Sequence, residues 1–364
     1  MDNSNNSFLV LFLAPVRSYL EDDEVSEILI NGPNQIYVES KGKLHLTEAR
    51  FPSEQNLRAA AANIAKSVGR LLDDANPRLD ARLPDGARVH AVIPPLARCG
   101  TVIAIRKFKK DTLTIDKLRA YGSFSDEAVQ LIHALVALHK NVIVSGGTSS
   151  GKTSVLNALS SFIGDDERVL VLEDASELQL QQRHVVCFET RKADKNGKGE
   201  VTIRDLIHSS LRLRPDRLVI GEIRGGEALD LLQALNTGHA GSMSTIHANS
   251  PLDCLYRLET CALLSGIEIP LTALRSQVAS AIDAVVHTAR LMDGSRKLMA
   301  ISEVLPLQNG EYRISDLLTW QTDHLTPEGK VEGRFVLRNR PTFTEQAAMC
   351  GLTLPDFTIS CTIS

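Results

Sequence analysis

The sequence has few aromatic residues and no excess of positive charge. Aromatic residues make up 4% of the 364 residues, there is one tryptophan, and the formal net charge is −4. Proteins that bind single-stranded nucleic acid need a basic groove with interleaved aromatic side chains. The composition gives no sign of such a groove over the whole chain, so we expect no nucleic-acid partner, although a local basic face is not excluded.

Cysteines are scattered and hydrophobic runs are short. The six cysteines include no C-x-x-C pair, a pattern typical of reduced thiols in the cytosol. The most apolar N-terminal stretch, residues 8–16, is too short to span a bilayer and follows no basic segment of a secretory signal. We expect this stretch to begin a helix or to pack on a core.

Residues 146–153 match the phosphate-binding motif G-x-x-x-x-G-K-[ST] at every fixed position. A short β-rich apolar run precedes the motif, and apolar residues at helical spacing follow it. An ordinary glycine-rich turn would not account for both flanks. We therefore predict a nucleoside triphosphate site in which backbone N–H groups face the phosphates. Its residues are Gly146, Gly147, Thr148, Ser149, Ser150, Gly151, Lys152, Thr153 and Ser154.

Two further hydrophobic runs end in carboxylates. Residues 169–172 lead into Glu173, Asp174 and Glu177, and residues 218–220 lead into Gly221-Glu222. In open α/β sheets ligands bind at the carboxyl ends of the strands, so these acids are suited to hold Mg²⁺ or to orient water. The second run is a Walker B strand, whereas the first has a solvated turn as its alternative.

His239 and His247 lie in a third conspicuous segment, residues 236–249. No cysteine or carboxylate completes a zinc set at the usual spacing. We expect a histidine at a strand end to face the γ-phosphate, sensing it or bridging to a neighbouring subunit.

The order of elements predicts two domains. The first third is α+β, and from about residue 125 strands and helices alternate, which implies a parallel sheet covered by helices. Asp293-Gly294 predicts a hairpin. The predicted divisions are an α+β N-terminal domain (1–106), a basic linker (107–118), a P-loop α/β domain with a parallel-rich sheet (119–320) and a loop-rich tail (321–364).

These motifs in this order resemble the secretion superfamily of hexameric ATPases, which drive type II and type IV secretion and pilus assembly. Longer stretches resemble its CpaF-like branch, the assembly ATPases of Tad pili, from about residue 17 to 310. The stretches concerned are residues 85–95, 105–108, 199–205, 211–216 and 242–250. One departure is Ala240, which follows His239 where the family often has aspartate.

The resemblance implies a RecA-like fold for the P-loop domain and roles for single residues. Lys152 and Thr153 would bind the phosphates and Mg²⁺ of ATP. Glu177 would be the catalytic base, Glu173 would support it, and Glu222 would position Mg²⁺ and its water shell.

The resemblance also implies roles for arginines. Arg88 and Arg106 would reach the nucleotide from the N-terminal domain. A guanidinium at a subunit interface can neutralise the charge that develops on the γ-phosphoryl group. The candidates for that role are Arg204, Arg212 and Arg214. For each of them a surface ion pair is the alternative.

The phosphate loop and the acids predict an ATPase, and the resemblance implies that it is a homohexamer that converts hydrolysis into domain motion. Its partner would be an inner-membrane platform protein of a pilus or secretion machine, at the cytoplasmic face of the membrane. Three alternatives share the phosphate loop: a RecA-like nucleic-acid motor, a small-molecule kinase, and a nucleotide-gated scaffold without turnover. The kinase would not account for the Gly-Glu pair or the histidine segment.

Overall fold

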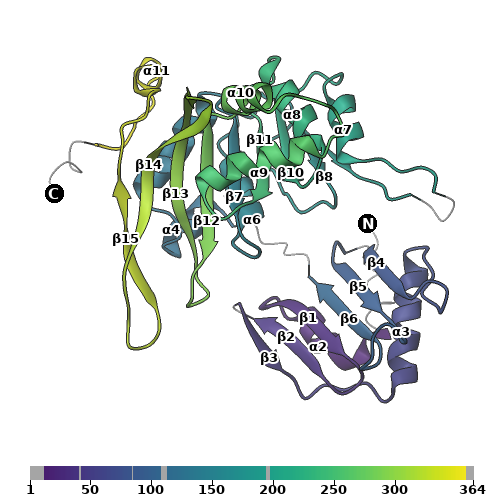
Figure 1. The fold of residues 1–364 in the computed structure, drawn as a ribbon. Helices are drawn as coiled ribbons and strands as arrows, with labels where there is room; N and C mark the ends of the chain where they lie inside the picture. Colours follow the sequence, from purple (N-terminus) through teal and green to yellow (C-terminus); the bar gives the residue numbers. More distant parts are fainter. Residues whose placement is uncertain (1–11, 41, 84, 108–112, 194–196, 358–364) are drawn as a thin grey trace. The chain divides into compact units, whose positions relative to one another are not determined.

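The computed structural model describes residues 12–40, 42–83, 85–107, 113–193 and 197–357. The chain divides into two compact units, Met1–Asp111 and Thr112–Ser364 (Figure 1). Part of the predicted linker, residues 108–112, lies outside the described residues. Its second half enters helix α4 (Ile115–Ala120), which Thr114 caps and whose Leu118 is buried in the core of the second unit.

In the described part of the first unit, a six-stranded antiparallel sheet packs with three helices around one core. In spatial order the strands are β3 (Lys43–Leu46), β2 (Ile36–Ser40), β1 (Val25–Asn31), β6 (Val102–Arg106), β5 (Arg88–Val92) and β4 (Arg78–Arg82). The helices are η1 (Ala14–Val16), α2 (Arg17–Glu21) and α3 (Glu54–Ser67). Leu57 and Ile64 of α3 pack into the same core as Ile28 and Ile30 of β1.

Strand β4 was not predicted from the sequence. It lies at the edge of the sheet, and of its five residues only Leu79 is buried. Its polar and apolar residues do alternate, but the pattern is only five residues long and contains one large apolar side chain, that of Leu79. The strands of the unit that were expected near residues 27, 35, 44, 89 and 101 are present.

The second unit is built on a nine-stranded sheet. Six neighbouring strands are parallel, and the remaining three extend the sheet in antiparallel pairing. In spatial order they are β9 (Val185–Glu189), β8 (Val169–Glu173), β10 (Arg217–Ile223), β11 (Met243–His247), β7 (Val142–Gly146), β12 (Ala284–Arg290), β13 (Arg296–Gln308), β14 (Glu311–Leu325) and β15 (Val331–Leu337). This confirms the predicted α/β fold with a parallel-rich sheet.

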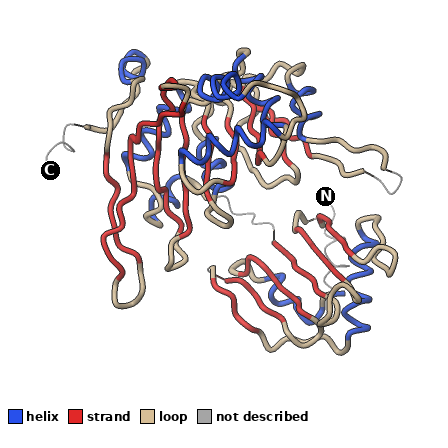
Figure 2. The backbone as a smooth tube through the Cα atoms, viewed as in Figure 1, coloured by secondary structure: helices blue, strands red, loops and turns tan. Residues whose placement is uncertain are grey.

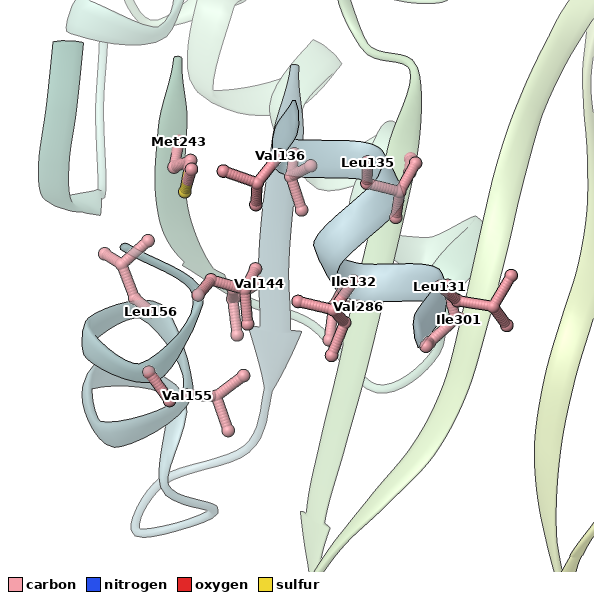
Figure 3. Close-up of a cluster of buried hydrophobic side chains, with 14 of the residues drawn as sticks. Leu131, Ile132, Leu135, Val136, Val144, Val155, Leu156, Met243, Val286 and Ile301 are labelled. Atoms are coloured by element: carbon pink, nitrogen blue, oxygen red, sulfur yellow. The ribbon is translucent and has the colours of Figure 1, made fainter. Parts of the chain in front are cut away.

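Helices cover both faces of this sheet (Figure 2). Helices α5 (Asp126–Ala137) and α6 (Lys152–Ser160) pack on one face, where their side chains gather with those of the strands (Figure 3). The other face carries α7 (Ile203–Ser210), α8 (Glu227–Asn236), α9 (Pro251–Leu263) and α10 (Leu271–Ala281). Along β7, Val142 and Val144 contribute to the first core and Ile143 to the second. Each fully buried side chain of this kind contributes about 1.5–3 kcal/mol, so the strand that leads to the phosphate loop is firmly held.

The prediction of a loop-rich tail was wrong for residues 321–337. Strands β14 and β15 pair through this region, and Trp320 packs edge-to-face on Phe335 with ring centroids 4.9 Å apart. Most side chains of β15 are only partly buried, so its sequence lacks the strict apolar alternation from which a strand is predicted. The short helix α11 (Thr344–Met349) follows.

The hairpin predicted at Asp293-Gly294 is confirmed, because β12 and β13 pair antiparallel on either side of it. Among the described residues, no helix is both long enough and apolar enough to cross a bilayer.

Candidate active site

Four neighbouring strands bring predicted site residues to one edge of the large sheet. In the order β7, β11, β10 and β8, the strands are parallel, so their carboxyl ends lie at the same edge. Strand β7 ends at Gly146, β11 ends at His247, β10 carries Glu222 and β8 ends at Glu173. This edge is where ligands bind in open α/β sheets.

The loop between β7 and α6 needs glycine at two positions. A Cβ atom on Gly146 would lie 2.3 Å from the carbonyl oxygen of Thr288 on β12. Gly151, which precedes the first residue of α6, has φ of +95°, in the left-handed region that favours glycine. The strand therefore turns sharply into the helix, and the N-terminus of α6 faces the loop, as an anion site requires.

Lys152 is buried and bends back over the loop. Its Nζ donates hydrogen bonds to the carbonyl oxygens of Gly147 (2.9 Å) and Gly146 (3.1 Å). Burial lowers the pKa of Lys152, and the nearby Glu222 carboxylate opposes this shift. The flexible side chain can exchange these carbonyl oxygens for phosphate oxygens without leaving the loop.

The other predicted residues of the loop differ in exposure. Ser150 is buried, and its Oγ accepts a hydrogen bond from Thr288 Oγ1 (3.2 Å). Thr148 and Ser149 are exposed, whereas Thr153 and Ser154 are half-buried in the first turn of α6. The sequence did not identify Thr288, because it lies on another strand and belongs to no motif.

Glu173 organises the acidic segment that follows β8. Its buried Oε1 accepts hydrogen bonds from the backbone N–H groups of Glu177 (2.8 Å) and Leu178 (3.0 Å). A Cβ atom on Gly221 would lie 3.0 Å from Cγ of Glu173, so the glycine of the Gly221-Glu222 pair makes room for this side chain. Glu173 thus determines where Glu177, which is half-buried, lies.

Lys152, His247 and Glu222 form one chain of contacts. Nζ of Lys152 lies 3.3 Å from Nδ1 of His247, and Nε2 of His247 lies 2.8 Å from Oε1 of Glu222. Burial and then the charge of Lys152 lower the pKa of His247, while Glu222 raises it. The net pKa of His247 lies below its usual value.

Arg224 belongs to the same site, although the sequence analysis gave it no role. Its Nη2 donates to Oε2 of Glu222 (2.5 Å), and its Nη1 lies 3.4 Å from Oδ2 of Asp174. The hydrogen bond with Glu222 raises the pKa of Arg224. Its position two residues after Glu222, just past the end of β10, is the signal that could have identified it.

The structure corrects the prediction for His239. This residue precedes β11, whereas His247 ends it, so the two histidines lie at opposite edges of the sheet. His239 is tied to the end of α8 instead: its backbone N–H donates to the carbonyl oxygen of Ala234 (3.4 Å), and its ring Nδ1 lies 3.2 Å from the same oxygen. A five-residue strand separates His239 from the phosphate loop, so it does not face the γ-phosphate in its own chain.

The three candidate interface arginines also separate into two groups. Arg204 lies in the first turn of α7, where its Nε is 2.8 Å from Oδ2 of the buried Asp230. Arg212 and Arg214 follow the last turn of α7, are exposed, and precede the amino end of β10. The latter pair therefore lies at the opposite edge of the sheet from Glu222.

Arg88 and Arg106 lie on the first unit as directly paired residues of β5 and β6. Arg106 is also paired with Glu27 of β1. Burial and the charge of Glu39 raise the pKa of Glu27 above its usual value, and Arg106 opposes this shift only in part. The contact of both arginines with a nucleotide stays a prediction.

Comparison with known proteins places these features in a family context. The sequence profile described as "Type II/IV secretion system protein" matches residues 12–323. A protein of Mycobacterium tuberculosis (strain H37Rv) with the provisional name of conjugal transfer protein is 36% identical over 327 residues, which cover 88% of this chain and 92% of that protein. The type IV secretion system protein VirB11 of Bartonella quintana is 28% identical over 337 residues, which cover 83% of this chain and 94% of that one. Among solved structures, the Legionella pneumophila ATPase DotB has a similar fold, with a TM-score of 0.59, 19% identity and 79% of each chain covered.

Proposed function

Because this chain belongs to the family of type II/IV secretion system proteins, we propose that it is an ATP hydrolase that works as the motor of a secretion or pilus machine. The observation that supports this best is the chain of contacts from Lys152 through His247 to Glu222, beside the phosphate loop. A loop that only bound a phosphate would not need a Walker B carboxylate linked to the loop lysine.

The residues of the site fit ATP with Mg²⁺. The glycine-rich loop, the N-terminus of α6 and Lys152 provide positive potential for phosphates. The Thr153 hydroxyl is an oxygen ligand of the kind that Mg²⁺ prefers, and the Glu222 carboxylate can accept hydrogen bonds from water bound to the metal. Bound Mg²⁺ would neutralise charge on the β- and γ-phosphates.

The two carboxylates of the site have different tasks in this proposal. Both oxygens of Glu222 already contact protein groups, Oε1 with His247 and Oε2 with Arg224. Glu222 therefore acts on the water shell of the metal rather than as a direct ligand. Glu177 takes the proton of the attacking water, and Glu173 fixes the loop from which Glu177 reaches the water.

Among the three candidate arginines, Arg204 is the best suited to act on a neighbouring subunit. Asp230 holds its Nε, and the side chain remains 39% exposed. An arginine that is oriented in advance loses less entropy when it meets a phosphate. Arg212 and Arg214 are second choices, because both follow α7 at the other edge of the sheet.

The assembly and its partners follow from the family relationship. We propose a homohexamer at the cytoplasmic face of the membrane, whose subunits act on an inner-membrane platform protein. Arg88 and Arg106 would complete the nucleotide site from the first unit, and hydrolysis would change the arrangement of the two units. Within the family, we assign the chain to the CpaF-like branch of Tad pilus motors on the motifs given above.

The test is steady-state ATPase activity against protein concentration for the wild type, Lys152→Ala and Glu222→Gln. Arg313→Ala is the control, because Arg313 contacts Gln308 near the β13–β14 turn. If the chain is an assembly-dependent motor, the specific ATPase activity of the wild type should rise with protein concentration. Lys152→Ala and Glu222→Gln should lose this activity, and Arg313→Ala should keep it. Tight ATP binding without turnover at any concentration would contradict the proposal for the isolated chain and favour a nucleotide-gated scaffold. Salt-dependent binding of single-stranded DNA would instead favour a nucleic-acid motor.

A further inference from the structure

One side chain outside all the predicted motifs contacts the backbone of the phosphate loop. Nε of Arg296, the first residue of β13, donates a hydrogen bond to the carbonyl oxygen of Ser149 (2.9 Å). Ser149 has φ of +59°, which is uncommon for a residue other than glycine. The backbone at Ser149 is therefore in a conformation that its own sequence does not favour, and Arg296 is a contact that stabilises it.

This contact has a direct consequence for the N–H group of the next residue. In a planar trans peptide, the carbonyl oxygen and the following N–H point in opposite directions. Because Arg296 holds the Ser149 carbonyl, the Ser150 N–H is directed away from Arg296. In the structure this N–H donates across the loop to the carbonyl oxygen of Gly147 (3.4 Å). Inward N–H groups are the groups that a phosphate loop offers to its ligand.

Arg296 is itself held in place by a segment near the start of the second unit. The Ser123 Oγ donates to the backbone carbonyl oxygen of Arg296 (2.7 Å), and the Leu298 N–H donates to the carbonyl oxygen of Ser123 (3.1 Å). Nζ of the neighbouring Lys297 donates to the carbonyl oxygen of Gly122 (2.5 Å) and lies 4.8 Å from the centroid of the Trp320 ring. Gly122 and Ser123 connect α4 to α5.

We propose that Arg296 is a positioning residue for nucleotide binding, which fixes the Ser149–Ser150 peptide in its phosphate-binding orientation and ties the loop to the segment at Gly122–Ser123. The inference rests on the proposed function, because it assumes that the loop binds the phosphates of a nucleotide. Arg296 acts through the Ser149 carbonyl and needs no contact with the nucleotide. Its loss therefore weakens binding while leaving the reacting groups around Glu177 in place.

The experiment measures the affinity of the full chain for ADP with Mg²⁺ by titration calorimetry, together with kcat and KM for ATP. The hydrogen bond is charge-assisted but solvent-exposed, so Arg296→Ala should weaken ADP binding and raise KM by about five- to tenfold. With ATP in excess, kcat should change by less than about twofold, because the transition-state contacts remain. Arg296→Lys keeps a positively charged donor group on a shorter side chain and should recover part of the affinity.

Two further variants separate this role from a general structural one. Arg313→Ala removes an arginine from the neighbouring strand β14 and should leave ADP affinity unchanged. Ser123→Ala removes the hydrogen bond to the Arg296 backbone, so it should weaken ADP binding in the same direction but less. Thermal unfolding is recorded for every variant. If Arg296→Ala does not fold, the ADP affinities of Arg296→Lys and Ser123→Ala test the inference.

The outcomes distinguish this inference from the proposed function. Wild-type ADP affinity in Arg296→Ala would overturn the inference and leave the proposed function intact. A loss of kcat with unchanged affinity would also overturn it, because the residue would then act in the chemical step. Failure of the wild type itself to bind ADP would overturn the proposed function first.

Discussion

His247 and Glu222 lie on adjacent parallel strands, with Nε2 of the histidine 2.8 Å from Oε1 of the glutamate. Nδ1 of the same ring lies 3.3 Å from Nζ of Lys152. The histidine thus connects the group that would bind phosphate to the carboxylate that would order the metal-bound water. A change in the position of Lys152 when phosphate binds would be transmitted to Glu222 through one ring.

We expect His247→Gln to lower kcat by about 10- to 100-fold, because a small misplacement of a catalytic group lowers the reaction rate by about this factor. ADP affinity should change much less, since the phosphate loop is intact. Steady-state kinetics and titration calorimetry measure the two effects. His239→Gln is the matched control: its ring contacts Ala234 at the other edge of the sheet, so kcat should stay within about twofold of the wild type. Equal losses in both variants would contradict the assignment.

Glu173 and Glu177 should separate into a structural and a catalytic residue. Glu173→Ala removes the acceptor of two backbone hydrogen bonds and should lower the free energy of unfolding by about 1–3 kcal/mol, with loss of activity. Glu177→Gln should lower kcat at least about 100-fold without a measurable change in thermal stability. Urea unfolding and ATPase assays give both quantities. A stable Glu173→Ala variant with wild-type activity would show that Glu173 does not organise the segment.

The buried Arg217 should be essential for the stability of the second unit. Its guanidinium donates to Oε2 of Glu167 (2.5 Å) and to the carbonyl oxygens of Val136 and Gly241. Burial raises the pKa of Glu167, but the hydrogen bond and charge of Arg217 outweigh this effect, and the net pKa lies below its usual value. Arg217→Met leaves that carboxylate without its arginine partner and should lower the free energy of unfolding by about 3–5 kcal/mol.

The matched variant for Arg217 is the double substitution Arg217→Met with Glu167→Gln, in which no charge is left unpaired. It should recover part of the lost stability. Chemical denaturation measures the free energy of unfolding of the single and the double variant. If the single and double variants unfold at the same denaturant concentration, the loss comes from packing and from the hydrogen bonds to Val136 and Gly241 rather than from the charge of Glu167.

Stability should decrease in mild acid, partly because of His287. This histidine is buried on β12, with Nδ1 2.9 Å from Oγ of Ser145. Burial lowers its pKa below 6.5, and Lys152 adds to this, while Asp253 and the Asn249 backbone oppose it. The unfolded chain therefore binds the proton first as the pH falls through 6.5, and the folded state loses stability until the pH passes the folded pKa. The maximal slope is about 1.4 kcal/mol per pH unit.

The measurement is the free energy of unfolding between neutral pH and about pH 5, around the ordinary histidine pKa. In His287→Gln, the free energy of unfolding should depend less on pH below pH 6.5. The pKa of His247 is lowered as well, so part of the dependence should remain in that variant and become smaller in the double variant His247→Gln with His287→Gln. An unchanged slope in His287→Gln would show that His287 does not titrate abnormally.

Much of the fold and half of the site could be predicted because their signals are local. The phosphate loop, the apolar run before Glu222 and the alternation of helices and strands depend on residues a few positions apart. The strands that were not predicted, among them β4 and β9, lie at sheet edges, where each is only five residues long and mostly exposed or half-buried, so its sequence pattern is short. The tail was taken for loops for the same reason, since β15 forms the other edge.

The sequence by itself determined that this chain has a phosphate loop at a strand-to-helix turn and acids at strand ends, because both patterns are fixed by short-range backbone chemistry. Only the tertiary structure decided which residues meet there. It separated His239 from His247 and brought Arg296 to Ser149, 147 residues apart in the chain. The physical reason is that strand order and direction set the edge at which each side chain lies, and that order depends on how the whole sheet buries its apolar residues.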